Sequence, residues 1–530
     1  MKKNLFKIVI ILVCFAFVLI VAIKEPEVSF GDQTEPEAET EDESMVPEPS
    51  DTTETDALPI ELVNNPDLRI LITTDDFSRD IHDKVKVSSN KDFQLLGEDG
   101  TVFADYNAWE IIDLDSFRLE TGETLIFKGE GKISIPSLKR MQGTPEYYGS
   151  LQIYKEEEGF CIINIVPMEK YLLTVVPSEM PSAYPLEALK AQAVCARSYA
   201  YHYVVNEPGL PHGAHMNDST DYQVYNNIQE TESTNLAVKE TEGILLTRDE
   251  LPVSTYFFST SCGFTTNETV WKEYFNGEEW QDGQMPQVAY KAGSPKVHSD
   301  VVFEPVAVAQ PPAVEAISTD SGVGLLYTPE ALAREDNFRA YITSDIKDFL
   351  EAEEQWYRWT YQGIISADTI EERLLARYEA RPDLILTFDQ KKDIYVNQEI
   401  DKIGKITNIE VIKRLPGGVA DELLIETTKD TYLVIGEYNI RYVLSDGESE
   451  IVRNDGSVVA VSNLLPSAYF IIEPEFASSD NGETITLLGG GYGHGVGMSQ
   501  NGARQAALQG MTYEEILELF YHGLELKKAN

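Results

Sequence analysis

The sequence has few cysteines and few basic residues for its 530-residue length. Three of its four cysteines lie outside an apolar N-terminal run, and an odd number excludes a framework of disulfides. Cys161 and Cys195 are interpreted as small buried residues, and a single disulfide among the three, with Cys262, stays open. The 42 lysines and arginines are outnumbered by 89 aspartates and glutamates, which gives a net charge of −47. Such a field repels phosphate backbones, so we expect no nucleic-acid partner.

Long apolar runs are also scarce, and the one candidate for a membrane span lies at the N-terminus. Lysines precede an uninterrupted apolar run from Ile8 to Ile23, and Lys24 closes it. No A-x-A cleavage site follows, so we expect an uncleaved single-pass anchor over residues 1–24, with a cleaved signal peptide as the alternative. The preceding lysines predict a cell-membrane location with the globular part extracytoplasmic. Residues 25–59, rich in Glu, Thr, Pro and Asp, are expected to form a disordered acidic linker.

The rest of the chain alternates between β-rich and helical patterns. Its 42% hydrophobic residues suffice for a buried core, and its length predicts two to four structural units. Apolar spacing indicates a helix from Pro185 to about Tyr203, and Val253 to Ser259 is typical of a strand. We expect an α+β fold with β-rich flanks around a helix-containing core. The expected divisions are 60–165 (β-rich), 166–282 (core with Glu179), 283–344 (insertion), 345–480 (helical to about 375, then strands) and 481–530 (glycine-rich motif and C-terminal helix).

Glu179 is the first candidate for chemistry. It lies in an apolar, proline-bounded turn just before the helix that starts at Pro185, after the apolar stretch from Leu172 to Val176 and beside Met180. A carboxyl group desolvated by such neighbours has a raised pKa and can act as a general acid near neutral pH. The alternative is that Glu179 only caps the helix.

The second candidate is a glycine-rich segment that runs from Gly489 to Gly497. Its glycines permit positive φ around His494, whose imidazole then either faces a ligand or serves as a structural hydrogen-bond donor. Ser499 is expected to cap the last helix, and Gln500 to read a sugar hydroxyl or a backbone group. The glycine spacing does not match a dinucleotide or phosphate loop.

These segments, together with DYQVY (221–225), YFFSTSCGFT (256–265) and GEYNIR (436–441), resemble the stage II sporulation protein D and amidase-enhancer (SpoIID/LytB) family. The resemblance runs in the family's order from about Leu68 to Leu524. It implies a lytic transglycosylase that cuts the MurNAc–GlcNAc β-1,4 bond of peptidoglycan, leaves a 1,6-anhydroMurNAc end and prefers glycan strands stripped by a partner N-acetylmuramoyl amidase. A role in sporulation or in vegetative wall remodelling stays open.

The resemblance also assigns roles to residues. It makes Glu179 the catalytic acid, and one carboxylate suffices because the sugar's own C6 hydroxyl is the nucleophile. No cofactor is implied. The substrate-binding residues that it implies are Arg197, Gln223, Tyr225, His494, Ser499 and Gln500.

One departure from the family concerns zinc. Tyr222 and Asp221 stand where zinc-binding members have a cysteine and a histidine, so the thiolate site is absent and we expect no metal. A different metal held by His212, His215, Asp218 and Asp221 is the alternative. Two further hypotheses compete with an enzyme: a glycan-binding protein that only stimulates an amidase, and a wall-spanning scaffold.

Overall fold

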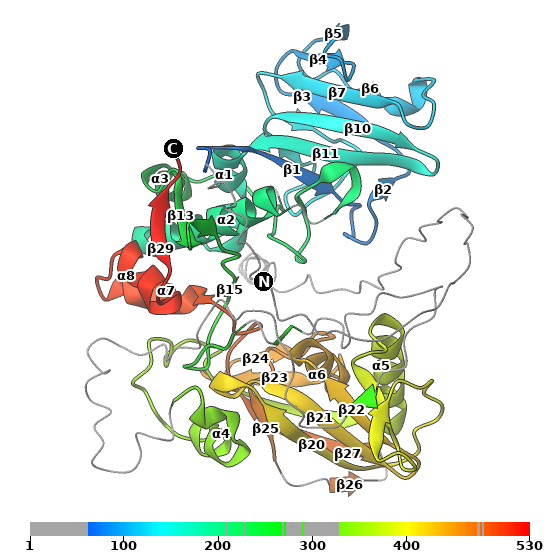
Figure 1. Cartoon of the computed structure of the whole chain (residues 1–530), viewed down its shortest axis with the longest axis vertical. Coiled ribbons are helices and arrows are strands. Elements are labelled where there is room, and N and C mark those ends of the chain that lie inside the picture. Colours follow the sequence, from blue (N-terminus) through cyan, green and yellow to red (C-terminus); the bar gives the residue numbers. More distant parts are fainter. Residues whose placement is uncertain are drawn as a thin grey trace, which may run out of the picture.

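The computed structural model describes residues 62–206, 209–226, 228–267, 270–271, 289–290, 328–473, 477–479 and 482–530. The expected anchor and linker, and most of the expected insertion at 283–344, lie outside these ranges. Among the helices described, none combines the length and apolar character that a membrane span needs. The described elements form two bodies, drawn one above the other in Figure 1.

The first body begins as an antiparallel sheet with the strand order β12-β1-β11-β10-β7-β4-β5, in which only β1 and β12 pair in parallel and β2 adds to β11. A smaller sheet has the order β6-β3-β8-β9. Alternate residues of β10, such as Leu151 and Ile153, are buried, as expected of a sheet with one face on the core. The strands are β1 (Asp67–Ile72), β2 (Ile81–His82), β3 (Lys86–Ser89), β4 (Phe93–Leu96), β5 (Val102–Tyr106), β6 (Ile112–Asp113), β7 (Thr124–Gly129), β8 (Ile133–Ser134), β9 (Glu146–Tyr147), β10 (Ser150–Glu156), β11 (Gly159–Pro167) and β12 (Met216–Asn217).

Three helices follow the central strand β11: α1 (Met168–Glu179), α2 (Leu186–Val205) and α3 (Glu232–Glu240). Pro167 and Pro185 stand immediately before α1 and α2, where the fixed φ of proline suits a helix start. Thirteen residues of α2 are buried, including polar Gln192 and Arg197, because other elements cover α2 on several sides. The predicted helix over 185–203 is therefore confirmed.

The C-terminus returns to complete this first body. Helices α7 (Gln500–Leu508) and α8 (Tyr513–Phe520) pack on α2, and β29 (Glu525–Lys528) pairs antiparallel with β13 (Ile244–Arg248), beside β14 (Leu251–Pro252). In Figure 1 these red elements lie against the green ones. Short strands β15 (Phe257–Phe258) and β28 (Met498–Ser499) pair in parallel where the chain leaves and re-enters. The second body is thus inserted into the first.

The second body contains two six-stranded sheets, β16-β19-β18-β22-β21-β20 and β24-β23-β17-β27-β25 with β26 on β27. Its helices are α4 (Glu335–Ile342), α5 (Ala367–Ala380) and α6 (Glu437–Val443). Its strands are β16 (Ala289–Tyr290), β17 (Trp359–Ile365), β18 (Ile385–Asp389), β19 (Ile394–Val396), β20 (Ile406–Arg414), β21 (Ala420–Thr427), β22 (Thr431–Ile435), β23 (Glu450–Arg453), β24 (Val458–Ala460), β25 (Phe470–Ile472), β26 (Ala477–Ser479) and β27 (Gly482–Gly489).

The α+β class is confirmed, with eight α-helices in the described part of a β-rich chain. The helical stretch expected from 345 to about 375 is confirmed only at its end, where α5 lies; its earlier part is wrong, because buried Trp359 opens the strand β17. The strand expected over 253–259 shrinks to two residues, since its partner β28 itself consists only of Met498 and Ser499. The final helical part is two helices, separated at Gly510, which has φ +93°.

Candidate functional site

Glu179 is the last residue of α1, and the chain turns sharply after it because Met180 is extended, with φ −129°. The glutamate is half-buried beside fully buried Val176 and Met180. Its Oε1 accepts a hydrogen bond of 2.6 Å from the backbone N–H of Val224. Its Oε2 has no hydrogen-bond partner among the residues that the structure describes. Within the described ranges, one carboxylate oxygen is therefore held by a hydrogen bond and the other is not.

Burial dominates the electrostatics of this carboxyl group. It raises the pKa of Glu179 from 4.5 to about 7, and the Val224 N–H acts weakly in the other direction. No charged side chain contributes to this shift. Near neutral pH the carboxyl group is thus poised between acid and base, as its apolar neighbours in the sequence predict.

The loop that carries Val224 is fixed by a buried ion pair. Asp218 accepts hydrogen bonds from the N–H and hydroxyl of Thr73, at 2.9 and 2.6 Å, and from Nε and Nη2 of Arg140, at 3.1 and 2.6 Å. Asp218 and the Arg140 side chain are almost wholly buried. With four donors on one buried carboxylate, Asp218 anchors the backbone that reaches Glu179.

Gln223 and Tyr225, on either side of Val224, point into the protein. The Tyr225 hydroxyl donates to Asn164 Oδ1 at 3.1 Å, and its ring packs at 4.9 Å from that of Tyr171. Gln223 Nε2 donates to the Ala196 carbonyl at 3.0 Å. Its Oε1 is buried and has no partner within the described ranges. These two side chains fix the loop from the inside.

The structure brings Gln500 to Glu179. Gln500 Nε2 donates to the Glu179 backbone carbonyl at 2.9 Å and to Gln192 Oε1 at 3.3 Å. The first residue of α7 thereby touches the last residue of α1, although they are 321 positions apart. Of the two alternatives open for Gln500, the one seen here is contact with a backbone group.

Ser499 caps α7, as the sequence predicts, because its Oγ accepts from the Gly502 N–H at 3.2 Å. The same hydroxyl donates to Oε1 of Glu351 at 2.5 Å. Glu351 belongs to the second body and is fully buried. It also accepts hydrogen bonds from the N–H and the hydroxyl of Ser261.

His494 lies in the glycine-rich loop with both ring nitrogens engaged. Nδ1 accepts from the Val496 N–H at 3.1 Å, so Nε2 carries the proton and donates to the Phe257 carbonyl at 3.1 Å. Burial first, and then the positive charge of Arg441, lowers the pKa of His494 to about 4. Its geometry is that of a neutral structural donor. The loop glycines serve backbone pairing: Gly497 has φ +74°, and a Cβ there would collide with the Tyr256 carbonyl.

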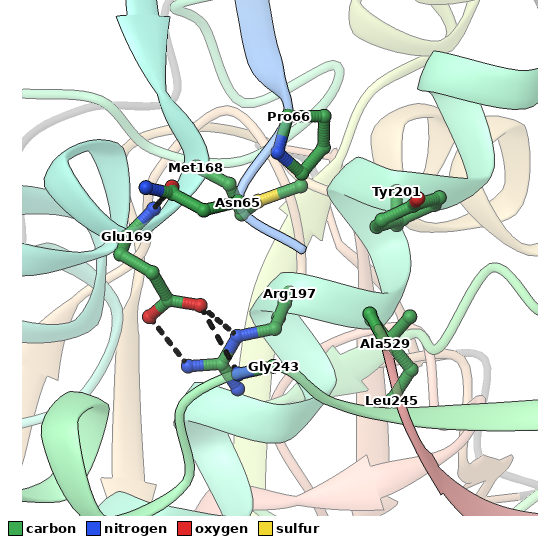
Figure 2. A pocket seen from close by; sticks show the side chains of 9 residues that line it. All are labelled: Asn65, Pro66, Met168, Glu169, Arg197, Tyr201, Gly243, Leu245 and Ala529. Carbon is green, nitrogen blue, oxygen red and sulfur yellow. Dashed lines mark hydrogen bonds and ion pairs between the residues drawn. The ribbon is translucent and has the colours of Figure 1, made fainter. Parts of the chain in front are cut away.

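Arg197 lies at the opposite end of α1 from Glu179. Its guanidinium binds both oxygens of Glu169, at 2.7 and 2.9 Å (Figure 2). It also reaches the carbonyls of Val238 and Ile244. Glu169 and Glu179 are ten residues apart on one helix, which is about 15 Å. Arg197 and Glu169 line a small hollow with Asn65, Pro66, Met168, Tyr201, Gly243, Leu245 and Ala529. The structure therefore does not bring Arg197 to the carboxyl group of Glu179.

The alternative metal ligands are not gathered. His212 pairs with Glu156 at 2.8 Å and stacks on Tyr154, while Asp218 holds Arg140. Over the described ranges no three His, Cys, Asp or Glu side chains meet as a metal site. Cys161, Cys195 and Cys262 are buried and free, so the disulfide left open above is not formed.

Sequence reasoning missed three polar participants: Glu351, Ser261 and Gln192. Glu351 stands in the acidic run EAEE (351–354), where the sequence does not distinguish a buried acid from solvated ones. Its only signal is the apolar pair Phe349 and Leu350 just before it. Gln192 lies fully buried on α2 with its Nε2 unpartnered in the described part of the chain.

Two family models match separate parts of this chain. A sequence model of the family described as stage II sporulation protein (SpoIID) matches residues 156–247, which include Glu179 and Val224. A model described only as a domain of unknown function (DUF8618) matches residues 315–497, most of which lie in the second body. His494 falls within the second match, and Ser499 and Gln500 fall outside both.

Relatives align along most of the chain. Stage II sporulation protein D of Bacillus subtilis (strain 168) is 23% identical over 383 residues, 69% of this chain and 76% of that protein. An uncharacterized protein of Brachyspira hyodysenteriae is 26% identical over 387 residues, 73% of each chain. The amidase enhancer of Bacillus subtilis is 24% identical over 66% of this chain, which spans 39% of the enhancer. Residues 156–247 thus match the SpoIID family model, and the chain is similar along about two thirds of its length to proteins named stage II sporulation protein D and amidase enhancer.

Proposed function

We propose that this protein is a lytic transglycosylase that cuts the MurNAc–GlcNAc β-1,4 bond of peptidoglycan and leaves 1,6-anhydroMurNAc ends. The observation that carries the proposal is the state of Glu179. Its pKa is raised to about 7, one oxygen is held by the Val224 N–H, and no other charged group shifts its pKa. A single carboxyl group that can both give and take a proton near pH 7 is what this reaction requires.

The reaction would use Glu179 twice. Its free oxygen first donates a proton to the glycosidic oxygen, so that the bond from MurNAc C1 breaks and GlcNAc leaves with a 4-hydroxyl. The resulting carboxylate then takes the proton of the MurNAc C6 hydroxyl, whose oxygen bonds to C1 and closes the anhydro ring. The Glu179 proton is restored and no water is consumed. No second carboxylate is needed, unlike in hydrolases.

The surroundings of Glu179 support a neutral, amide-bearing substrate. Gln500 Nε2 binds the Glu179 backbone carbonyl and Gln192 Oε1, and Gln223 directly precedes Val224, whose N–H binds the Glu179 carboxylate. Carboxamides donate and accept hydrogen bonds without carrying charge, which suits N-acetyl groups and hydroxyls. We keep Gln223, Tyr225, His494, Ser499 and Gln500 in the proposal as residues that shape this site. For Arg197 we propose support of α1 in place of contact with sugar.

Partners and location belong to the same proposal. A relative named amidase enhancer aligns with two thirds of this chain, which supports work beside an N-acetylmuramoyl amidase that strips the glycan strands. We propose a single-pass anchor at residues 1–24 that holds the two bodies outside the membrane, next to the cell wall. We also propose that no metal or cofactor takes part.

The test is to incubate the purified full-length chain with peptidoglycan, either intact or stripped by an amidase, and to identify products by mass spectrometry. The proposal predicts 1,6-anhydroMurNAc ends from wild type, more of them from stripped strands, and none from Glu179→Gln. Saturable glycan binding without products from either substrate would instead support the non-catalytic amidase enhancer.

A further inference from the structure

Glu351 is a buried acid that the reaction above does not use. It is fully buried in the second body, in the turn before Trp356. Its Oε1 accepts from the Ser261 N–H at 3.0 Å and from the Ser499 hydroxyl at 2.5 Å, and its Oε2 accepts the Ser261 hydroxyl. Three donors from two distant parts of the chain thus converge on one carboxylate.

Both serine hydroxyls are also acceptors. Ser499 Oγ receives the Gly502 N–H at the start of α7, and Ser261 Oγ receives the Gly263 N–H at 3.1 Å. Each hydroxyl therefore has its proton free for Glu351 and no other acceptor in the described part of the chain. Replacing the carboxylate would leave both hydroxyl protons without an acceptor.

Within the described ranges, no cation is among the groups that shift the pKa of Glu351. Burial raises the pKa of Glu351 to about 7, the serine donors lower it, and the nearby acid Glu354 raises it further. A buried acid without a basic partner opposes folding, so its presence here has to be explained by geometry. The contacts of α7 supply that geometry.

The same turn holds α7 a second time. Glu354 Oε1 accepts from Arg504 Nη1 at 2.7 Å and from Gln505 Nε2 at 2.6 Å. Between these two attachments, α7 starts with Gln500, which binds the carbonyl of Glu179. The path from the second body to the acid therefore runs through four residues, Glu351, Ser499, Gln500 and Glu179, joined by two hydrogen bonds and the peptide bond between Ser499 and Gln500.

We propose that Glu351 is a positioning residue for Glu179, through which the inserted second body fixes the start of α7 against the end of α1. This inference rests on the proposed function for its kinetic consequence, but the contact itself can be tested without activity. It gives the region matched only as a domain of unknown function a defined role at the site.

The kinetic test compares Glu351→Ala and Glu351→Gln with Glu353→Gln, a matched control that removes an exposed charge from the same turn. We expect Glu351→Ala to lower kcat about 10- to 100-fold with KM within about twofold, since small displacements of a catalytic group are costly. Glu351→Gln, which keeps an acceptor oxygen, recovers part of the rate.

In a Gln500→Ala background, the effect of Glu351→Ala on kcat shrinks to less than about threefold, because both changes act on one path. Full additivity would overturn the proposal.

Hydrogen exchange on the full chain gives the activity-independent arm. In Glu351→Ala the amides of residues 499–502 and of Val224 should exchange about tenfold faster or more, while those of α8 and β29 keep their rates. Unchanged exchange at 499–502, or an equal increase throughout, would overturn the positioning role. If wild type releases no anhydro product, the proposed function fails by itself, and the exchange result still decides this contact.

Discussion

Removing the charge of Glu179 should stabilise the protein at alkaline pH while it abolishes activity. The pKa of this carboxyl group is about 7 in the folded chain and 4.5 in the reference state. Between these values the folded protein keeps a proton that the unfolded chain has lost, so stability falls as pH rises from 4.5 to 7. Stability is lost because Glu179 has to ionise in an apolar site.

The magnitude follows from the shift. A shift of two and a half pKa units corresponds to a loss of stability of about 3 kcal/mol at high pH. About 1 kcal/mol of this loss has already occurred at pH 5. Because Glu179 is only half-buried, solvent screens part of this, and we expect a change of about 2 kcal/mol between pH 5 and pH 8. Glu179→Gln keeps the acceptor for the Val224 N–H and cannot ionise, so its unfolding free energy relative to that of wild type should rise by this amount between pH 5 and pH 8.

The assay is urea unfolding of both proteins at pH 5, 6, 7 and 8, followed by tryptophan fluorescence. Glu351 titrates in the same range but is present in both proteins, so the difference between them isolates Glu179. Glu353→Gln, which removes an exposed carboxylate, serves as the control for the loss of one negative charge. A difference for Glu179→Gln that stays flat with pH would refute the raised pKa and, with it, the assignment of Glu179 as an acid near pH 7.

Two further predictions concern the buried ion pairs. Asp218→Ala should lower the unfolding free energy by about 3–5 kcal/mol, because it strands the buried guanidinium of Arg140; a loss below 1 kcal/mol by chemical denaturation would contradict the anchoring role given to this pair. Arg197→Met should destabilise by a similar amount, with about half recovered when Glu169→Leu is added, while KM for glycan in the folded protein stays within about twofold; a rise in KM of tenfold or more would restore the substrate-binding role.

Local features were predictable from the sequence where one short pattern decides them. Pro185 predicted the start of α2, and Ser499 predicted the cap of α7. The apolar neighbours of Glu179 predicted that its pKa is raised. Side-chain partners across long separations were not. Arg197 was expected to bind substrate because the family resemblance implied it. In the structure it binds Glu169 at one end of α1, whereas Glu179 lies at the other end.

Sequence patterns predicted the structure least well in and around the inserted second body. Trp359 looked helical because short apolar runs have no unambiguous period, and pairing with β27 made it a strand. In the sequence Glu351 was indistinguishable from exposed Glu353 in the same acidic run, since its burial depends on Ser261 and Ser499, which lie 90 and 148 positions away. The sequence shows which residue types such a cluster contains, but it does not show that the fold brings them into contact.

The central claim is that Glu179 serves the sugar's own hydroxyl and not water, and one measurement tests it most directly. Amidase-stripped glycan is digested by the full chain in water enriched in ¹⁸O, and the new ends are weighed by mass spectrometry. The account predicts ends that are lighter than hydrolysis products by one water, carry no ¹⁸O, and are absent with Glu179→Gln. Reducing ends labelled with ¹⁸O would show a hydrolase and contradict it.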